Sequence, residues 1–352
     1  MTLMHGDFKR RQARRLLGER VHHEFNGRDT SPGLPDLCVS LLTEQKLTWP
    51  FLRDGYKSLN RIRERPLHCN GFSVLLQHNP GRMKSTMARV NEEDINRRKC
   101  FLCLHHLPEG QKGILYRGAY LILCNPMPVF SAHFTIARTD HCPQAISEHV
   151  SIFLRLMADF GPGWTILYNG PKCGASAPDH FHFQAVPSGA MPIQKEILMK
   201  EKLAPIAHKD GVVFYRVKDV GREVIILEGD TQAAVGSCLT SFVDSLKKVL
   251  RVKEEPMINV AGSYEQAKWR LAIFPRSKHR PDTFFKKGPA RIAVSPAVIE
   301  MGGVLVTPFA RDFERLDAAA VEPIYDEVSL KGNSVESAIH AIVRPTAYST
   351  SS

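Results

Sequence analysis

The chain has 352 residues, of which 43% are hydrophobic and 24% charged, and its formal net charge is +11. This length and composition are typical of a globular protein with one large domain or two similar halves. The sequence contains no apolar run of about 18 residues, so no membrane span is expected. The basic first twenty residues lack the apolar core of a secretory signal, which favours a cytoplasmic location. The remaining positive charge is spread along the chain and weakly favours phosphorylated small molecules as partners.

Residues 1–68 are expected to form a mainly helical N-terminal extension around a Gly/Pro-rich break. The next stretch, 71–78, has the alternation of a strand and runs into a basic turn at 79–86. This turn carries Arg82 and Lys84, and a guanidinium group can bind two phosphate oxygens at once. The turn is therefore either a phosphate-binding element or an ordinary solvated loop.

The eight cysteines are too sparse for a disulfide scaffold, but Cys100 and Cys103 form a CxxC pair. Two thiolates at this spacing can bind one zinc ion, provided that two further ligands exist. Candidate ligands lie nearby or farther along the chain: His105, His106, His141 and His180. The alternative is a pair of buried thiols without a metal.

The middle of the chain predicts strands at 119–124, 133–137 and 164–168, with a helix at about 144–160. Residues 169–178 form a Gly/Ala/Ser loop whose backbone amides could meet an anion.

Directly after this loop, the run Asp-His-Phe-His-Phe-Gln at 179–184 alternates as a strand would. One face then carries His180, His182 and Gln184, and the aromatic side chains of Phe181 and Phe183 lie on the other face. The pattern indicates either a site built on a strand or a surface strand that happens to contain histidines.

The same order of elements recurs: two strands within 212–228, a helix at about 232–253, and strands at 257–260 and 268–274. Aligning the prolines that follow each half places Lys268, Arg270 and Ala272 where the first half has His180, His182 and Gln184. We therefore expect a first repeat at 69–192, a second repeat without the motif at 193–316 and a helical tail at 317–352.

The run from Asn169 to Gln184, with its H-x-H-x-Q motif, resembles the histidine-triad superfamily. Its closest match there is the branch of galactose-1-phosphate uridylyltransferase and of the nucleotide-sugar and diadenosine-polyphosphate phosphorylases. The resemblance covers about residues 70–310 and implies an α+β fold of two fused repeats, each an antiparallel sheet with a packing helix. Phe181 and Phe183 depart from the commonest pattern and are similar to the GDP-hexose phosphorylases.

In this resemblance His182 is the nucleophile that carries a nucleotidyl group, and Gln184 binds a phosphate oxygen. The expected substrate-binding residues share positions with the family's phosphate and nucleoside contacts: Arg82, Lys84, Asn125, Asn169 and Ser176. The expected structural zinc ligands are Cys100, Cys103, His141 and His180, with His105 or His106 as alternatives to His141.

The resemblance implies a nucleotidyltransferase or phosphorylase acting on a nucleotide sugar or dinucleoside polyphosphate. Phosphate or a sugar 1-phosphate would be the acceptor, and a homodimer is one implied assembly. Two alternatives stay open: a nucleotide hydrolase of the same fold, and a non-catalytic, zinc-stabilised protein that binds nucleotides or nucleic acid.

Overall fold

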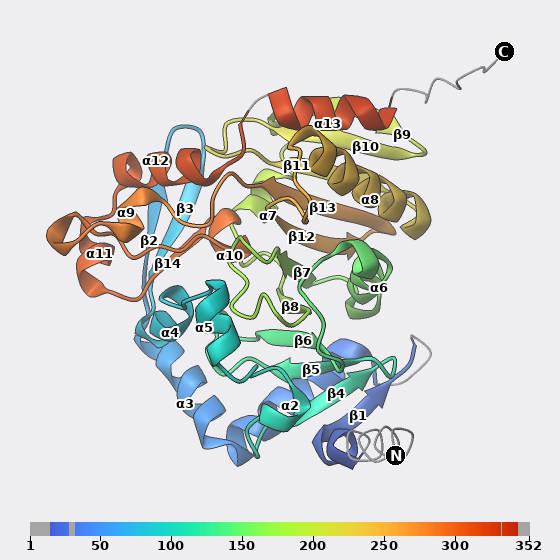
Figure 1. The fold of residues 1–352 in the computed structure, drawn as a ribbon, viewed down its shortest axis with the longest axis vertical. Coiled ribbons are helices and arrows are strands. Elements are labelled where there is room, and N and C mark those ends of the chain that lie inside the picture. The colour runs from blue at the N-terminus through green and yellow to red at the C-terminus, as the bar shows by residue number, and fades with distance from the viewer. Residues whose placement is uncertain (1–14, 28–31, 332, 344–352) are drawn as a thin grey trace.

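A large mixed sheet forms the centre of the protein, as the computed structural model of residues 15–27, 32–331 and 333–343 shows (Figure 1). Its 11 strands follow the order β1-β4-β5-β6-β8-β7-β12-β13-β11-β10-β9. Every neighbouring pair is antiparallel except β1 and β4, which are parallel. The strands in chain order are β1 (Val21–Phe25), β4 (Gly113–Tyr116), β5 (Tyr120–Cys124), β6 (Phe134–Arg138), β7 (Trp164–Asn169), β8 (His182–Pro187), β9 (Leu203–Lys209), β10 (Val212–Val217), β11 (Ile225–Gly229), β12 (Ile258–Glu265) and β13 (Lys268–Pro275).

The strand order reads the same outward in both directions from the central pair of β7 and β12. On one side follow β8, β6, β5 and β4, and on the other follow β13, β11, β10 and β9. Each half also contributes one long helix, α6 (Val150–Phe160) or α8 (Gln232–Val249). Pro187 pairs with Trp164, and Pro275 pairs with Ile258, so both hairpins end at equivalent points. The predicted α+β fold of two fused repeats is confirmed.

A second sheet of three strands lies beside the first, in the order β14-β3-β2 (Figure 1). Its strands are β2 (Arg63–His68), β3 (Ser73–His78) and β14 (Val304–Thr307). The stretch 71–78 therefore forms the expected strand, but it pairs with β14 from near the other end of the chain. Residues 295–308 contain α10 (Val298–Met301) followed by β14.

The N-terminal segment is less helical than its sequence suggests. It contains α2 (Leu34–Thr48) and α3 (Pro50–Ser58), but β1 and β2 also fall within residues 1–68. β1 adds to β4, a strand far along the chain, whereas β2 forms a hairpin with the next strand, β3. Residues 1–14 lie outside the described part of the chain.

The remaining helices are short or C-terminal. The basic turn at 79–86 becomes a 3₁₀ turn, Pro80–Arg82, followed by α4 (Met83–Thr86). The others are α5 (Glu92–Arg97), α7 (Ile193–Glu196), α9 (Asp282–Phe285), α11 (Ala310–Arg315), α12 (Ala318–Val328) and α13 (Asn333–Val343). Among the described residues, no helix is long and apolar enough to cross a bilayer.

The two faces of the large sheet pack against different cores. Phe181 and Phe183 are fully buried in a cluster that includes residues of α2, α6, α8 and α13. The opposite face contributes Leu167, Ala261 and other side chains to a second cluster with β3, β14, α10 and α12. Because side chains alternate along β8, His182 and Gln184 lie on that opposite face.

A buried carboxyl group ties β7 to the start of β12. Glu255 accepts hydrogen bonds from the Tyr168 hydroxyl at 2.5 Å and from the backbone N of Ile146 at 2.6 Å. Burial nevertheless raises the pKa of Glu255 from 4.5 to about 7, because the charged form is poorly solvated there.

The raised pKa of Glu255 predicts that the free energy of unfolding falls as pH rises. Between about pH 4.5 and 7 the folded protein holds the Glu255 proton whereas the unfolded chain releases it. We expect the free energy of unfolding of the wild type, relative to Glu255→Gln, to drop by roughly 2–3 kcal/mol between pH 5 and 8. Urea denaturation of both proteins across this range measures the difference, and a pH-independent difference would contradict the assignment.

Candidate functional site

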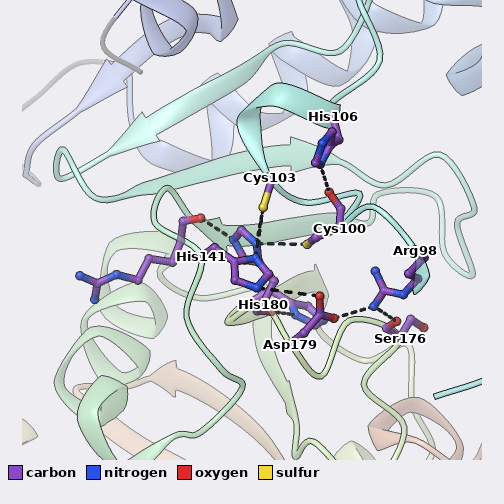
Figure 2. A network of polar contacts seen from close by, with 10 residues as sticks. Arg98, Cys100, Cys103, His106, His141, Ser176, Asp179 and His180 are labelled. Carbon is purple, nitrogen blue, oxygen red and sulfur yellow. Dashed lines mark hydrogen bonds and ion pairs between the residues drawn. The ribbon is translucent and has the colours of Figure 1, made fainter. Parts of the chain in front are cut away.

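Two cysteines and two histidines meet beside the start of β8 (Figure 2). The ligand atoms of Cys100, Cys103, His141 and His180 all lie within 4.8 Å of one another. The shortest contacts join Cys103 Sγ to His141 Nδ1 at 3.1 Å and Cys100 Sγ to His180 Nδ1 at 3.3 Å. The cysteines come from the loop after α5, and the two histidines follow β6 and precede β8.

The donor set and its surroundings fit a structural zinc ion. Two thiolates and two imidazoles form a complete Cys₂His₂ set. His180 Nε2 lies 2.7 Å from the backbone oxygen of Arg138, so Nε2 carries the proton and the lone pair of Nδ1 faces the sulfur atoms. His141 Nε2 lies 4.0 Å from a carboxylate oxygen of Asp179. The hydrogen bond of His180 to a backbone oxygen is the kind of outer contact that orients a metal-binding histidine.

Of the three alternatives for the fourth ligand, His141 is the one that joins this group. His106 turns its Nδ1 toward the backbone oxygen of Cys100, at 2.9 Å, and His105 is exposed on the surface.

His182 is held by its own strand and by a neighbouring loop. Its Nδ1 lies 2.9 Å from the backbone oxygen of His180, so Nδ1 donates a proton and Nε2 keeps its lone pair. Gln144 accepts a bond from the His182 backbone N at 2.8 Å and donates one to its oxygen at 2.9 Å. Burial lowers the pKa of His182 from 6.5 to about 4.

His180 thus acts twice. Its side chain belongs to the Cys₂His₂ group, whereas its backbone oxygen fixes the tautomer of His182. A displacement of His180 would therefore move the acceptor that orients the second imidazole.

The amide of Gln184 is oriented by a buried histidine. His133 Nδ1 accepts a bond from the backbone N of Val129 at 3.3 Å, so the proton sits on Nε2. That Nε2 donates to Gln184 Oε1 at 2.7 Å. Burial and the nearby charge of Arg82 lower the pKa of His133 to about 3, which keeps it neutral. The Gln184 NH₂ group is left as a donor for another molecule.

Arg82 and Ser176 meet at a small cavity of about 30 Å³ between the two halves of the chain. Arg82 Nη2 donates to Ser85 Oγ at 2.8 Å, and Ser85 Oγ lies 3.4 Å from Ser176 Oγ. The second half contributes Arg280 and Glu300, among other residues, to the lining. Burial raises the pKa of Glu300 to about 7. The hydroxyl and guanidinium donors would suit an oxyanion.

The other three residues expected to bind substrate are placed differently. Lys84 is exposed on α4. The Asn125 side chain closes a turn, with Oδ1 2.9 Å from the backbone N of Met127. Asn169 Oδ1 accepts bonds from Asn259 Nδ2 and from the first backbone N–H of α10, both at 2.8 Å. Asn169 therefore joins the two repeats, and only its NH₂ group could serve a ligand.

Three further residues of this region were not predicted from the sequence: His133, Gln144 and Arg280. His133 begins a predicted strand and Gln144 begins a predicted helix, so local patterns give both a structural reading. Arg280 comes from the second repeat and contributes through tertiary packing alone.

Taken together, the fold and these side chains define a class: an α+β protein with two fused repeats, of which the first carries a Cys₂His₂ group and an H-x-H-x-Q strand. Sequence comparison matches residues 41–187 to a domain of unknown function (DUF4922) and residues 194–347 to the GDPGP1-like C-terminal domain. No curated protein sequence matches the chain.

Yeast Ap4A phosphorylase Apa2 is a structural neighbour. Its crystal structure aligns with a TM-score of 0.55 at 14% identity, covering 81% of this chain and 97% of the yeast chain. The complex with AMP gives 0.52 at 15% identity, covering 83% and 97%. The complex with Ap4A gives 0.52 at 13% identity, covering 82% and 98%. The likeness establishes a shared fold.

Proposed function

We propose that this protein is an enzyme that transfers a nucleotidyl group through a covalent bond to His182. The main support for this proposal is the hydrogen bond from His182 Nδ1 to the His180 backbone oxygen, because it directs the lone pair of Nε2 away from the strand. The donor substrate is a nucleotide sugar or a dinucleoside polyphosphate. In support, the yeast neighbour is a phosphorylase whose structures contain AMP and Ap4A.

The proposed reaction has two displacements. In the first, His182 Nε2 attacks the α-phosphorus, an N–P bond forms, and the P–O bond to the next phosphate breaks with its electron pair on the departing oxygen. In the second, an oxygen of inorganic phosphate or of a sugar 1-phosphate attacks the same phosphorus. A new P–O bond forms, and the N–P electron pair returns to His182.

Charge on the phosphoryl oxygens would be stabilised by donors already fixed in place. The Gln184 NH₂ group is oriented by His133, and Arg82 stands near the same histidine. Ser176 and the backbone amides of the 169–178 loop would add uncharged donors.

We also propose that Cys100, Cys103, His141 and His180 bind zinc. The ion would supply no chemistry to the reacting phosphorus and would fix the strand that bears the nucleophile. Arg98 and Asp179 stabilise this region, because Arg98 donates to the Asp179 carboxylate at 2.5 Å and to the backbone oxygen of Ser176 at 3.5 Å (Figure 2).

The test is an intact-mass measurement on the wild-type chain. It should be incubated with UDP-, GDP- and ADP-sugars and with diadenosine polyphosphates, without an acceptor. We expect an acid-labile mass increase of one nucleotidyl group with the true donor. Adding phosphate, a sugar 1-phosphate or buffer alone then identifies the acceptor as the one that discharges it. Turnover of a donor without any protein-bound nucleotide would refute the covalent mechanism.

The orientation of Gln184 yields a further prediction. Gln184→Glu replaces the NH₂ donor by a second carboxylate oxygen facing an anionic phosphate. We expect kcat/KM to fall by roughly 10²–10³-fold, more than for Gln184→Ala, because a donor is lost and repulsion is added. Steady-state kinetics of both variants measure the order, and an equal or smaller loss in the glutamate variant would show that the amide does not face the phosphate.

A further inference from the structure

The ladder of backbone hydrogen bonds between β7 and β8 ends before it reaches the proposed nucleophile. Its last pair is Leu167 with Gln184, and continuation of the same register would pair Asn169 with His182. That pair is absent, although the structure describes both residues and places them in their strands. On the other side of β8 the ladder continues, because His182 still pairs with Ala137 of β6. The sheet is therefore split at His182 on the β7 side only.

The side chain of Gln144 fills this split. Its Oε1 accepts a bond from the backbone N of His182 at 2.8 Å. Its Nε2 donates to the backbone oxygens of His182 and Asn169, each at 2.9 Å. Gln144 is only 2% exposed, so water does not compete for these bonds. A buried side-chain amide thus replaces the absent ladder pair at the residue that bears the imidazole.

The loop that carries Gln144 is fixed on both sides of this residue's contacts. Its backbone N donates to the backbone oxygen of Pro178 at 3.1 Å. In the same loop, the backbone oxygen of Cys142 accepts a bond from the backbone N of Phe181 at 2.7 Å, and His141 belongs to the Cys₂His₂ group. Gln144 therefore projects from an anchored loop onto the start of β8.

We propose that Gln144 is a positioning residue for the nucleotidyl transfer, and this inference rests on the proposed function. Its amide holds the separated end of β8, so that the imidazole of His182 keeps its place and its tautomer. The bond from His182 Nδ1 to the His180 backbone oxygen depends on the backbone conformation of this short segment.

Loss of the Gln144 amide would leave the backbone N–H and C=O of His182 without their partners, or would let them pair with Asn169 instead. Either change displaces the imidazole. An error of about 1 Å in the position of a reacting group can cost roughly 10²-fold in rate.

The experiment compares wild type with Gln144→Met, which keeps the length of the side chain and removes its donor and acceptor. With the donor substrate found by intact mass, we expect the maximal rate of adduct formation to fall roughly 10²-fold. The donor concentration that gives half of this rate should stay within about threefold, because His133 still orients the Gln184 amide. Rapid-quench kinetics measure both quantities.

Gln45→Met is the matched control. Gln45 is also a buried glutamine, but its amide donates to the backbone oxygen of Gly110 at 3.0 Å. Its adduct should form within about twofold of the wild-type rate. Gln144→Asn keeps the amide on a side chain one carbon shorter and serves as a second variant if methionine disturbs folding. Its rate should fall about tenfold.

A spectroscopic measurement separates this inference from the proposed reaction. In ¹⁵N-histidine spectra, assigned with His182→Ala, wild type should show a single Nδ1–H tautomer for His182. Gln144→Met should show a mixture of both tautomers, and Gln45→Met should show the wild-type pattern. If wild type forms no adduct with any donor, the proposed transfer fails, and the tautomer of His182 still decides the role of Gln144. The positioning role is overturned if Gln144→Met keeps the wild-type tautomer, or if it forms the adduct at the wild-type rate.

Discussion

Replacing His182 by alanine should abolish turnover of the donor nucleotide, with a loss of roughly 10⁴–10⁶-fold in kcat, because the attacking nitrogen is removed. The same variant should show no nucleotidyl adduct by intact mass. Binding of the donor should change far less, since Gln184, Arg82 and Ser176 stay in place. Rapid-quench kinetics and calorimetry separate the two effects.

His105→Ala is the matched control for this result. His105 is an exposed histidine on the same half of the chain and outside the Cys₂His₂ group, so its removal should leave kcat within about twofold of wild type. An adduct that persists in His182→Ala would place the covalent bond on another residue. A comparable loss of kcat in His105→Ala would mean that the loss in His182→Ala does not identify His182 as the nucleophile.

Replacing Cys100 by serine should remove the metal and destabilise the chain. We expect wild type to hold about one zinc per chain and the variant much less, because serine is a poor zinc ligand. Loss of a structural metal is one of the few changes that cost as much as 4 kcal/mol or more in the free energy of unfolding. We also expect kcat to fall, because the backbone oxygen of His180 orients His182.

Cys69→Ser serves as the control, because Cys69 is a free thiol outside the Cys₂His₂ group. It should keep its zinc and its melting temperature within a few degrees. Metal analysis by mass spectrometry and thermal unfolding report the two quantities. Zinc retained in Cys100→Ser, His141→Ala and His180→Asn alike would show that the ligand set is wrong.

Local patterns predicted those parts of the fold that depend on neighbouring residues. The alternation in 179–184 places two aromatics in one core and the polar side chains on the opposite face, because side chains along a strand alternate. The equivalent prolines at 187 and 275 indicated the repeat, and the structure places both at hairpin ends. The strand β1 was missed because it forms by pairing with β4, far along the chain. The strand β2, which pairs with the next strand, was missed because its sequence, Arg-Glu-Arg-Pro-Leu-His, lacks the apolar alternation of a strand.

Local sequence patterns were enough to predict that the chain carries two similar halves, one of which has a CxxC pair and an H-x-H-x-Q strand. Only the folded chain shows that His141, rather than His105 or His106, lies next to the cysteines, because the loop after β6 returns to the start of β8. It also shows the partners that orient the site, His133 behind Gln184 and the His180 backbone oxygen beneath His182. Such hydrogen bonds depend on the distance and angle between two groups, and a pattern in the amino-acid sequence contains neither quantity.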